Sequence, residues 1–308
     1  MPDYSPARME ISAPRQLLVL FGLVCIGLLL GGFASFLMIT LTPGASLDDL
    51  NNGNTAFIGL LGWMQALGTF CLFALPALLF NLFLHPRKDY FYARKRRPAS
   101  LWLLAILLAI CALTATDLFA HLNEWIPISA NMRAHFQRME ANYDQQMLHL
   151  LQLKDFSQYL ISLLLIALLP ALFEELLFRG TLQQILLKWF GHPFWAILVT
   201  SIVFSAIHMS YFGFLPRLFL GILMGYVFYF GKSIWLNIII HFMNNGLVIT
   251  LLYYWQQKKG SMEEAMHITA PFSLEILGLV ALIGLFFLFR QVALKKGIMA
   301  HPDLSTQS

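Results

Sequence analysis

Two adjacent carboxylates and an arginine lie inside an apolar stretch of this chain. Glu174 and Glu175 stand side by side in the segment 168–180, and Arg179 follows four residues after Glu175. Because a charge near the centre of a bilayer costs about 2.5–3.5 kcal/mol on insertion scales, three such groups together indicate a functional site. In a helix, Glu175 and Arg179 would share one face and could pair, whereas Glu174 would point about 100° away. We therefore predict that Arg179 neutralises Glu175 while Glu174 faces a cavity, so that the two carboxylates have separate roles.

A histidine in the next apolar stretch is a candidate partner for Glu174. The tripeptide Gly191-His192-Pro193 is typical of a turn. Glu174 lies 17 residues before Gly191, and His208 lies 17 residues after it. If the flanking segments form an antiparallel helical hairpin, Glu174 and His208 are level with each other. A lone histidine within a membrane often only joins two helices by a hydrogen bond, but beside Glu174 a catalytic role is favoured.

A third apolar stretch carries a histidine and an asparagine four residues apart. His241 and Asn245 would lie on one helical face, where they offer two side-chain donors. Such donors can stabilise the oxyanion that forms during acyl transfer. The alternative interpretation is a hydrogen-bonded contact between helices. We expect Asn237 and Asn244 to lie off this face and to have structural roles.

The whole set of polar side chains matches hydrolysis of an amide bond by an activated water molecule. A carboxylate and an imidazole would hold and deprotonate the water, and donors would take up the charge of the carbonyl oxygen. Glu174, His208 and His241 could instead supply three ligands to zinc, with an open position for water. We favour activation by glutamate and histidine. The alternative functions are a proton-coupled transporter that uses buried Glu and His, and a non-catalytic membrane immunity or scaffold protein.

The elements that carry these residues are predicted to be transmembrane helices. Of the 308 residues, 58% are hydrophobic and only 12% are charged, with a mean hydropathy of +0.69, whereas soluble domains carry about 25% charged residues. The composition predicts an all-α, polytopic membrane protein with an intramembrane active site. Eight stretches approach the length of about 20 apolar residues that a span requires: 17–41, 56–84, 100–121, 157–189, 193–209, 212–230, 233–255 and 272–294.

The distribution of positive charge predicts the orientation. With both termini in the cytoplasm, most of the 20 Lys and Arg residues fall in cytoplasmic segments, as the positive-inside rule requires. The basic run 94–97 then contacts anionic lipid headgroups, and we expect no nucleic-acid partner. The polar segment 123–156 is predicted to form an interfacial or external helix. The pattern favours a multi-pass protein of a bacterial inner membrane.

Three motifs, in order and on separate apolar segments, resemble those of a known family. They are Glu174-Glu175-x-x-x-Arg179, Phe204-x-x-x-His208 and His241-x-x-x-Asn245. The set is similar to the CAAX protease and bacteriocin-processing family (CPBP or Abi) of intramembrane endopeptidases, whose eukaryotic relatives are the Ras-converting CAAX endopeptidases. The resemblance covers about residues 157–250, which it marks as a catalytic core of four helices. Residues 1–156 would then supply three helices and the external segment, and residues 251–308 a last helix and a cytoplasmic tail.

The resemblance also implies a role for each motif residue. Glu174 and His208 would activate the water, and His241 and Asn245 would bind the oxyanion. Glu175 and Arg179 would support the site. The family has been described both as metalloproteases and as glutamate-dependent enzymes, so a divalent metal such as zinc stays an open alternative. The implied partners are the lipid bilayer and a membrane-anchored or lipidated protein or peptide as substrate.

Overall fold

The protein is a bundle of helices in which the described part of the chain contains no strand. A computed structural model describes residues 11–46, 57–85, 89–94, 96–151, 153–258 and 270–298, so the predicted cytoplasmic tail, from residue 299 on, lies outside the described residues. The helices, with π-helical segments marked η, are α1 (Ala13–Leu41), α3 (Ile58–Thr69), η2 (Phe70–Ala74), α4 (Leu75–Leu84), α5 (Ala99–Glu124), α6 (Ala130–Leu150), α7 (Phe156–Ser162), η3 (Leu163–Leu168), α8 (Leu169–Leu177), η4 (Phe178–Leu182), α9 (Gln183–Phe190), α10 (Pro193–Ala206), α11 (Phe214–Gly231), α12 (Ile234–Gln257) and α14 (Phe272–Lys295).

Seven of the described helical stretches are long and apolar enough to cross a membrane, which confirms the predicted all-α membrane fold. The predicted span 193–209 corresponds to α10, which has only 14 residues and ends at Ala206. At 1.5 Å per residue α10 is about 21 Å long, shorter than the hydrocarbon core of about 30 Å. The loop after α10 therefore begins before the full thickness of the membrane has been crossed, at a level where the longer neighbouring helices still continue. His208 lies in that loop.

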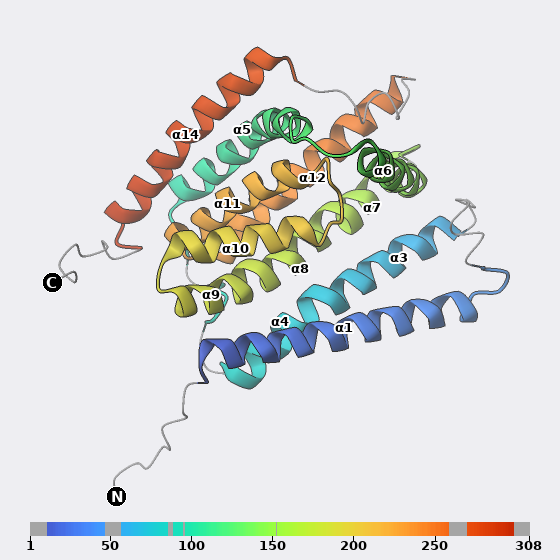
Figure 1. Ribbon diagram of the computed structural model, residues 1–308, viewed down its shortest axis with the longest axis horizontal. Coiled ribbons are helices and arrows are strands. Elements are labelled where there is room, and N and C mark those ends of the chain that lie inside the picture. Colours follow the sequence, from blue (N-terminus) through green and yellow to red (C-terminus); the bar gives the residue numbers. More distant parts are fainter. Residues whose placement is uncertain are drawn as a thin grey trace, which may run out of the picture.

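The helices form layers, with the predicted core in the middle (Figure 1). α14 packs on α5, and α5 packs on α11 and α12. On the other side, α1 pairs with α3 and α4, and α8 lies between this pair and the α10–α12 group. α6 lies at one end of the bundle, across the axes of the other helices. It is the helix predicted within the polar segment 123–156, and the Ser129 hydroxyl caps its first turn by accepting a hydrogen bond from the backbone N–H of Met132.

The stretch from Phe156 to Phe190 is one long helix with two π-helical interruptions. Pro170 stands in the first turn of α8, and because proline lacks a backbone N–H it cannot complete the α-helical ladder towards η3. The second interruption, η4, contains Arg179. π-Helical turns are often found at functional sites, and here they flank both sides of the segment with Glu174 and Glu175.

Two glycines allow α10 and α11 to approach closely. A Cβ atom added to Gly225 would lie 2.6 Å from a methyl carbon of Ile197, and one added to Gly221 would lie 3.0 Å from the Cβ of Ser201. Small residues four apart are a common way for helices to pack in membranes, because dispersion contacts replace the hydrophobic driving force. This contact fixes α11, which supplies backbone acceptors to the site.

Candidate active site

Glu175 lies at the centre of a buried polar cluster. Its side chain is fully buried, and one oxygen, Oε1, accepts a hydrogen bond from Arg179 Nη1 at 2.8 Å. The same oxygen lies 3.0 Å from His241 Nδ1. The other oxygen accepts a hydrogen bond from Asn237 Nδ2 at 3.3 Å. The predicted pairing of Glu175 with Arg179 is thus present, and a third and a fourth residue join it.

Arg179 is fully buried and has neutral partners as well as Glu175. Its Nη2 donates to the carbonyl oxygen of Gly221 at 3.3 Å, and its guanidinium carbon lies 4.6 Å from the ring centre of Phe204. A buried charge of this kind is stable only when it is paired and hydrogen-bonded. Glu175 and the carbonyl on α11 are partners of Nη1 and Nη2, and the Phe204 ring lies beside the guanidinium, whereas Nε makes no hydrogen bond with the described residues.

Asn237 belongs to the site, contrary to the prediction that it lies off the face of His241. It precedes His241 by four residues on α12, so the two side chains share one face, with Asn245 one turn further on. Its amide donates to Glu175 and, at 2.7 Å, to the carbonyl oxygen of Met224. The spacing of four residues was the signal in the sequence that would have found it.

Glu174 differs from its neighbour because no hydrogen bond joins its side chain to another described residue. Its side chain is buried, and its Oε2 atom makes no hydrogen bond with any described residue. His241 Nε2 lies 3.9 Å from this Oε2 atom. This separation is longer than a hydrogen bond and is of the kind that a bridging water molecule spans.

The hydrogen bonds of His241 determine which of its nitrogens can act. Glu175 already receives donors from Arg179 and Asn237, which favour its ionised form, so His241 Nδ1 carries the hydrogen and donates to it. In the neutral imidazole Nε2 is then a lone-pair acceptor, and this atom faces Glu174. An acceptor can hold or deprotonate water, whereas the predicted donation to an oxyanion requires a protonated ring.

The predicted alignment of His208 with Glu174 does not include a direct polar contact between the two side chains. No hydrogen bond or ion pair between these two described residues is present; instead, His208 Nδ1 donates to the carbonyl oxygen of Phe204 at 2.8 Å. The reason is that α10 ends at Ala206, so His208 lies in the following turn rather than on a continued helix. The side chain is exposed, at the edge of the site.

Phe204 connects the residues of the three motifs, although the sequence indicated no role for it beyond its place in the motif. Its ring centre lies 5.1 Å from that of His208 and 5.9 Å from that of His241. It also packs edge-on against Phe178, at 5.1 Å. Together with its contact to Arg179, this places an apolar wall beside the polar cluster and in contact with both histidines.

Asn245 is half-buried and has an unused donor. Its Oδ1 accepts a hydrogen bond from Asn244 Nδ2 at 3.3 Å, and its own Nδ2 makes no hydrogen bond with the described residues. It lies one helical turn from His241 on the same face of α12. This donor is available for an oxyanion.

The arrangement does not form a ready metal site. Both histidines donate Nδ1 and leave Nε2 available, which is the usual state of a metal-binding imidazole. However, no group of three or more His, Cys, Asp or Glu side chains among the described residues lies close enough to hold a metal ion. The candidate ligands Glu174, His208 and His241 therefore have suitable atoms but not the geometry of a metal centre.

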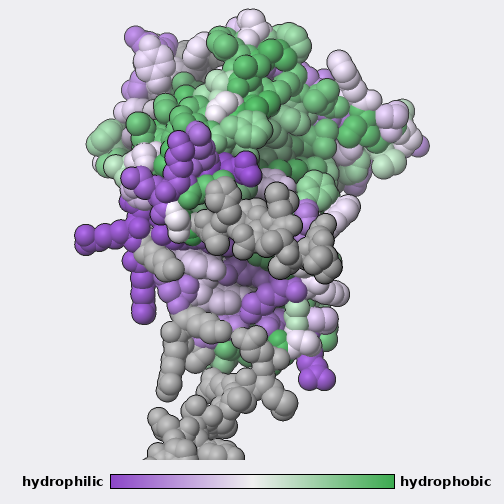
Figure 2. Space-filling view, turned by 90° about the vertical axis from the view of Figure 1, so that its left-hand side faces the viewer, coloured by the Kyte–Doolittle hydropathy of each residue, from purple (hydrophilic) through white to green (hydrophobic). Residues whose placement is uncertain are grey.

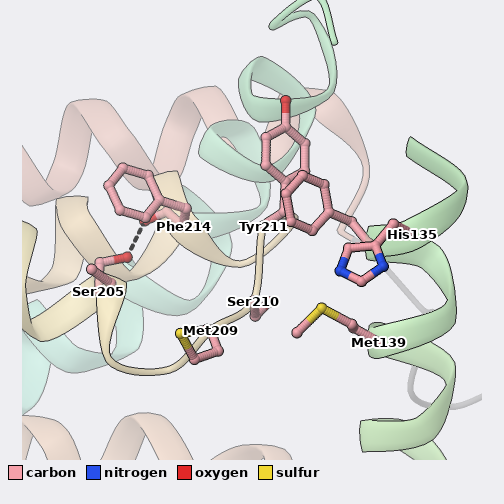
Figure 3. A pocket seen from close by; sticks show the side chains of 9 residues that line it. His135, Met139, Ser205, Met209, Ser210, Tyr211 and Phe214 are labelled. Atoms are coloured by element: carbon pink, nitrogen blue, oxygen red, sulfur yellow. Dashed lines mark hydrogen bonds between the residues drawn. The ribbon is translucent and has the colours of Figure 1, made fainter. Parts of the chain in front are cut away.

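A cavity of about 350 Å³ lies next to the turn that carries His208 (Figure 3). It opens between α6 and the loop from α10 to α11, and Ser205 and Met209 face His135 and Met139 across it. Ser210 at its rim donates to both carboxylate oxygens of Glu140 on α6, at 3.2 and 3.0 Å. Most of the lining side chains are apolar, so the outer part of the site suits apolar groups.

Comparison with known families agrees with the motifs. Residues 156–247 match the family model described as type II CAAX prenyl endopeptidase Rce1-like, and this segment contains all three motifs. Comparisons with curated proteins and with solved structures gave no significant match. The matched segment runs from the start of α7 to the part of α12 that carries His241 and Asn245. Residues 156–247 of this chain are therefore similar to the type II CAAX prenyl endopeptidase Rce1-like family.

Proposed function

We propose that this protein is an intramembrane endopeptidase that hydrolyses a peptide bond with a water molecule activated by Glu174 and His241. The observation that carries the proposal is the buried, unpartnered Oε2 of Glu174, 3.9 Å from the acceptor nitrogen Nε2 of His241. A water molecule in this gap donates one hydrogen bond to each atom, so its lone pair is free to attack a carbonyl carbon. Glu174 then takes the proton as the general base.

The surrounding residues keep His241 in the required tautomer. Glu175 accepts the Nδ1 hydrogen of His241, and Arg179 and Asn237 hold Glu175 in place. This arrangement assigns positioning roles to Glu175 and Arg179. It moves His241 from the expected oxyanion donor to the group that holds the water.

The remaining steps use the residues at the edge of the site. Nδ2 of Asn245 donates to the carbonyl oxygen as it becomes an oxyanion. Protonated Glu174 returns its proton to the leaving amine, which completes the cleavage of the C–N bond. His208 lies at the edge of the site, where its Nε2 makes no hydrogen bond with the described residues, and it guides the leaving group and its proton.

The substrate is a membrane-anchored or lipidated protein or peptide. The family description supports this class, and the apolar cavity beside His208 suits an apolar segment that approaches from the bilayer. The concentration of Lys and Arg at one end of the helices supports an inner-membrane protein with both termini in the cytoplasm.

The test is cleavage of a quenched fluorescent peptide by the purified full-length protein in nanodiscs, with a farnesylated CAAX peptide and its unmodified counterpart as substrates. Glu174→Gln and His241→Gln should each lower the rate by at least about 10², the contribution of a general base. The matched control is Glu275→Gln, which changes another fully buried glutamate, far from the site on α14. Full activity in both site variants would refute the proposal.

The alternatives predict different results in the same preparation. A proton-coupled transporter would show flux that depends on a proton gradient and no cleavage of either peptide. Metal dependence is tested separately by elemental analysis and by treatment with a chelator. The glutamate mechanism predicts full activity in protein from which metal has been removed, and loss of activity that zinc restores would contradict it.

A further inference from the structure

A second cavity lies at the opposite end of the bundle from α6. It has a volume of about 130 Å³ and is formed by the loop before α5, the helix α9 and the end of α11. Its lining residues include two lysines and two glutamines and no acidic residue: Tyr92, Gln183, Gln184, Leu187, Lys188, Phe228, Tyr229 and Lys232. Neither the motifs nor the proposed reaction uses any of these side chains. We call the feature the basic cavity.

The position of Lys232 in the basic cavity is fixed by its surroundings. It ends α11 with a left-handed backbone (φ 46°), and Tyr92 on the opposite wall is also left-handed (φ 52°). Such conformations are uncommon for residues other than glycine and are often found at functional sites. The Lys232 ammonium lies 5.5 Å from the ring centre of Tyr92 and 4.9 Å from that of Tyr229. Arg97 donates a hydrogen bond to the carbonyl oxygen of Lys232 and so stabilises the turn between α11 and α12.

The charge of the basic cavity is not neutralised by the groups around it. Burial lowers the pKa of Lys232, and no carboxylate in the described part of the chain counteracts this effect. The nearby carboxylate of Asp89 accepts hydrogen bonds from the backbone N–H groups of Ala93 and Arg94, at 2.8 and 3.0 Å. Gln183 is almost fully buried, and its Oε1 has no hydrogen-bond partner among the described residues. The cavity thus has cationic donors for an anion and one acceptor for a hydroxyl or amine.

The same end of the bundle carries the features of a membrane–water interface. Three tryptophans, Trp189, Trp195 and Trp235, are 44–55% exposed there. Tryptophan and tyrosine are enriched at the level of the lipid headgroups, and basic residues gather on the cytoplasmic side. Seen from this end, hydrophilic side chains gather across the middle of the protein, beside apolar side chains (Figure 2). The basic cavity therefore lies at the depth of lipid headgroups.

We propose that the basic cavity binds the phosphate-containing headgroup of an anionic lipid such as phosphatidylglycerol. Lys188 and Lys232 contact the phosphate, and Gln183 Oε1 accepts a hydrogen bond from a headgroup hydroxyl. Basic pockets between transmembrane helices are known to hold anionic headgroups. A lipid is favoured over a free phosphate ion because the exposed tryptophans place the cavity at the interface, where the headgroups are concentrated. The proposal is independent of the proposed proteolytic function.

The experiment measures the binding of phosphatidylglycerol and phosphatidylcholine to the purified full-length protein by native mass spectrometry. The test variant combines Lys188→Gln with Lys232→Asn, because asparagine tolerates the left-handed backbone that position 232 requires. The control variant combines Lys154→Gln with Lys258→Asn, which removes the same charge at the opposite end of the bundle. Lys258 also lies over a tyrosine ring, at 5.6 Å from its centre, and so matches the local setting of Lys232.

We expect the wild-type protein and the control variant to bind phosphatidylglycerol in preference to phosphatidylcholine with equal affinity. The test variant should lose roughly fivefold in affinity for each lysine removed, since a basic residue near an anionic lipid surface contributes about 1 kcal/mol. Equal affinity of the test variant and the wild type for phosphatidylglycerol would overturn the proposal, as would displacement of the lipid by an equal concentration of inorganic phosphate. The melting temperature of each variant is also measured in lipid-free detergent, and a value equal to that of the wild type shows that the variant is folded.

Discussion

Replacing the two adjacent glutamates one at a time should have different effects on the free energy of unfolding. Glu175 is fully buried and has three polar side-chain partners, whereas Glu174 is buried with Oε2 unpartnered. Glu175→Gln leaves the Arg179 charge buried without its counter-ion, and breaking a buried pair in this way costs about 3–5 kcal/mol. The new amide group also turns a donor towards Asn237 or Arg179, which are donors themselves. We expect a folded protein of much lower stability.

Glu174→Gln removes a buried carboxylate whose Oε2 makes no hydrogen bond with another described residue. A buried unpaired charge is itself destabilising by several kcal/mol, so the free energy of unfolding should stay the same or rise. Activity, by contrast, should fall by about 10²–10⁴, the contribution of a general base. The change therefore separates a catalytic carboxylate from a structural one.

The assay combines two measurements on each purified variant. The free energy of unfolding is followed by tryptophan fluorescence during titration of detergent micelles with a denaturing detergent, and the cleavage rate is followed with the quenched peptide. Glu275→Gln serves as the control, because Glu275 is fully buried and lies 3.2 Å from His121 on α5. This variant should lose stability and keep its activity. If Glu174→Gln lowered stability as much as Glu175→Gln, or cleaved at the wild-type rate, the assignment of separate roles would be wrong.

Three further variants test other parts of the site. Asn245→Ala should lower the cleavage rate by about 10²–10³ because it removes an oxyanion donor, whereas Asn244→Ala should have little effect; equal rates in both variants would refute this role. Asn237→Leu removes a hydrogen-bond donor to Glu175. It should lower the free energy of unfolding by about 1–3 kcal/mol and should also lower the cleavage rate. If neither value changed, the hydrogen bond would not position Glu175. Gly225→Ala should destabilise the protein by about 1–3 kcal/mol because the added methyl group meets α10, and a melting temperature equal to that of the wild type would contradict this packing.

Much of the fold follows from hydropathy, because a membrane span needs a long apolar helix and each span is visible by itself in the sequence. The predicted spans agree with the long helices except at 193–209, where α10 ends at Ala206. Hydropathy did not reveal this end, since the apolar composition continues through Ile207. The orientation in the membrane and the division into three segments stay predictions.

Within the site, the sequence determined the contacts that lie along a single helix. The pair Glu175 and Arg179 follows from the helical repeat, which also places His241 and Asn245 on one face. The same repeat places Asn237 there, and its contact with Glu175 corrects the interpretation that it lies apart. Such local geometry depends only on spacing and needs no knowledge of neighbouring helices.

Only the tertiary structure decided which histidine lies beside the unpartnered carboxylate of Glu174. Equal spacing from the turn predicted His208, yet His241 is the histidine that lies between the two glutamates. The choice depends on where α10 ends, on the packing of the Phe204 ring against both histidines, and on the close approach of α10 and α11 at Gly221 and Gly225. These are contacts between helices distant in the sequence, and the spacing within one helix contains no information about them.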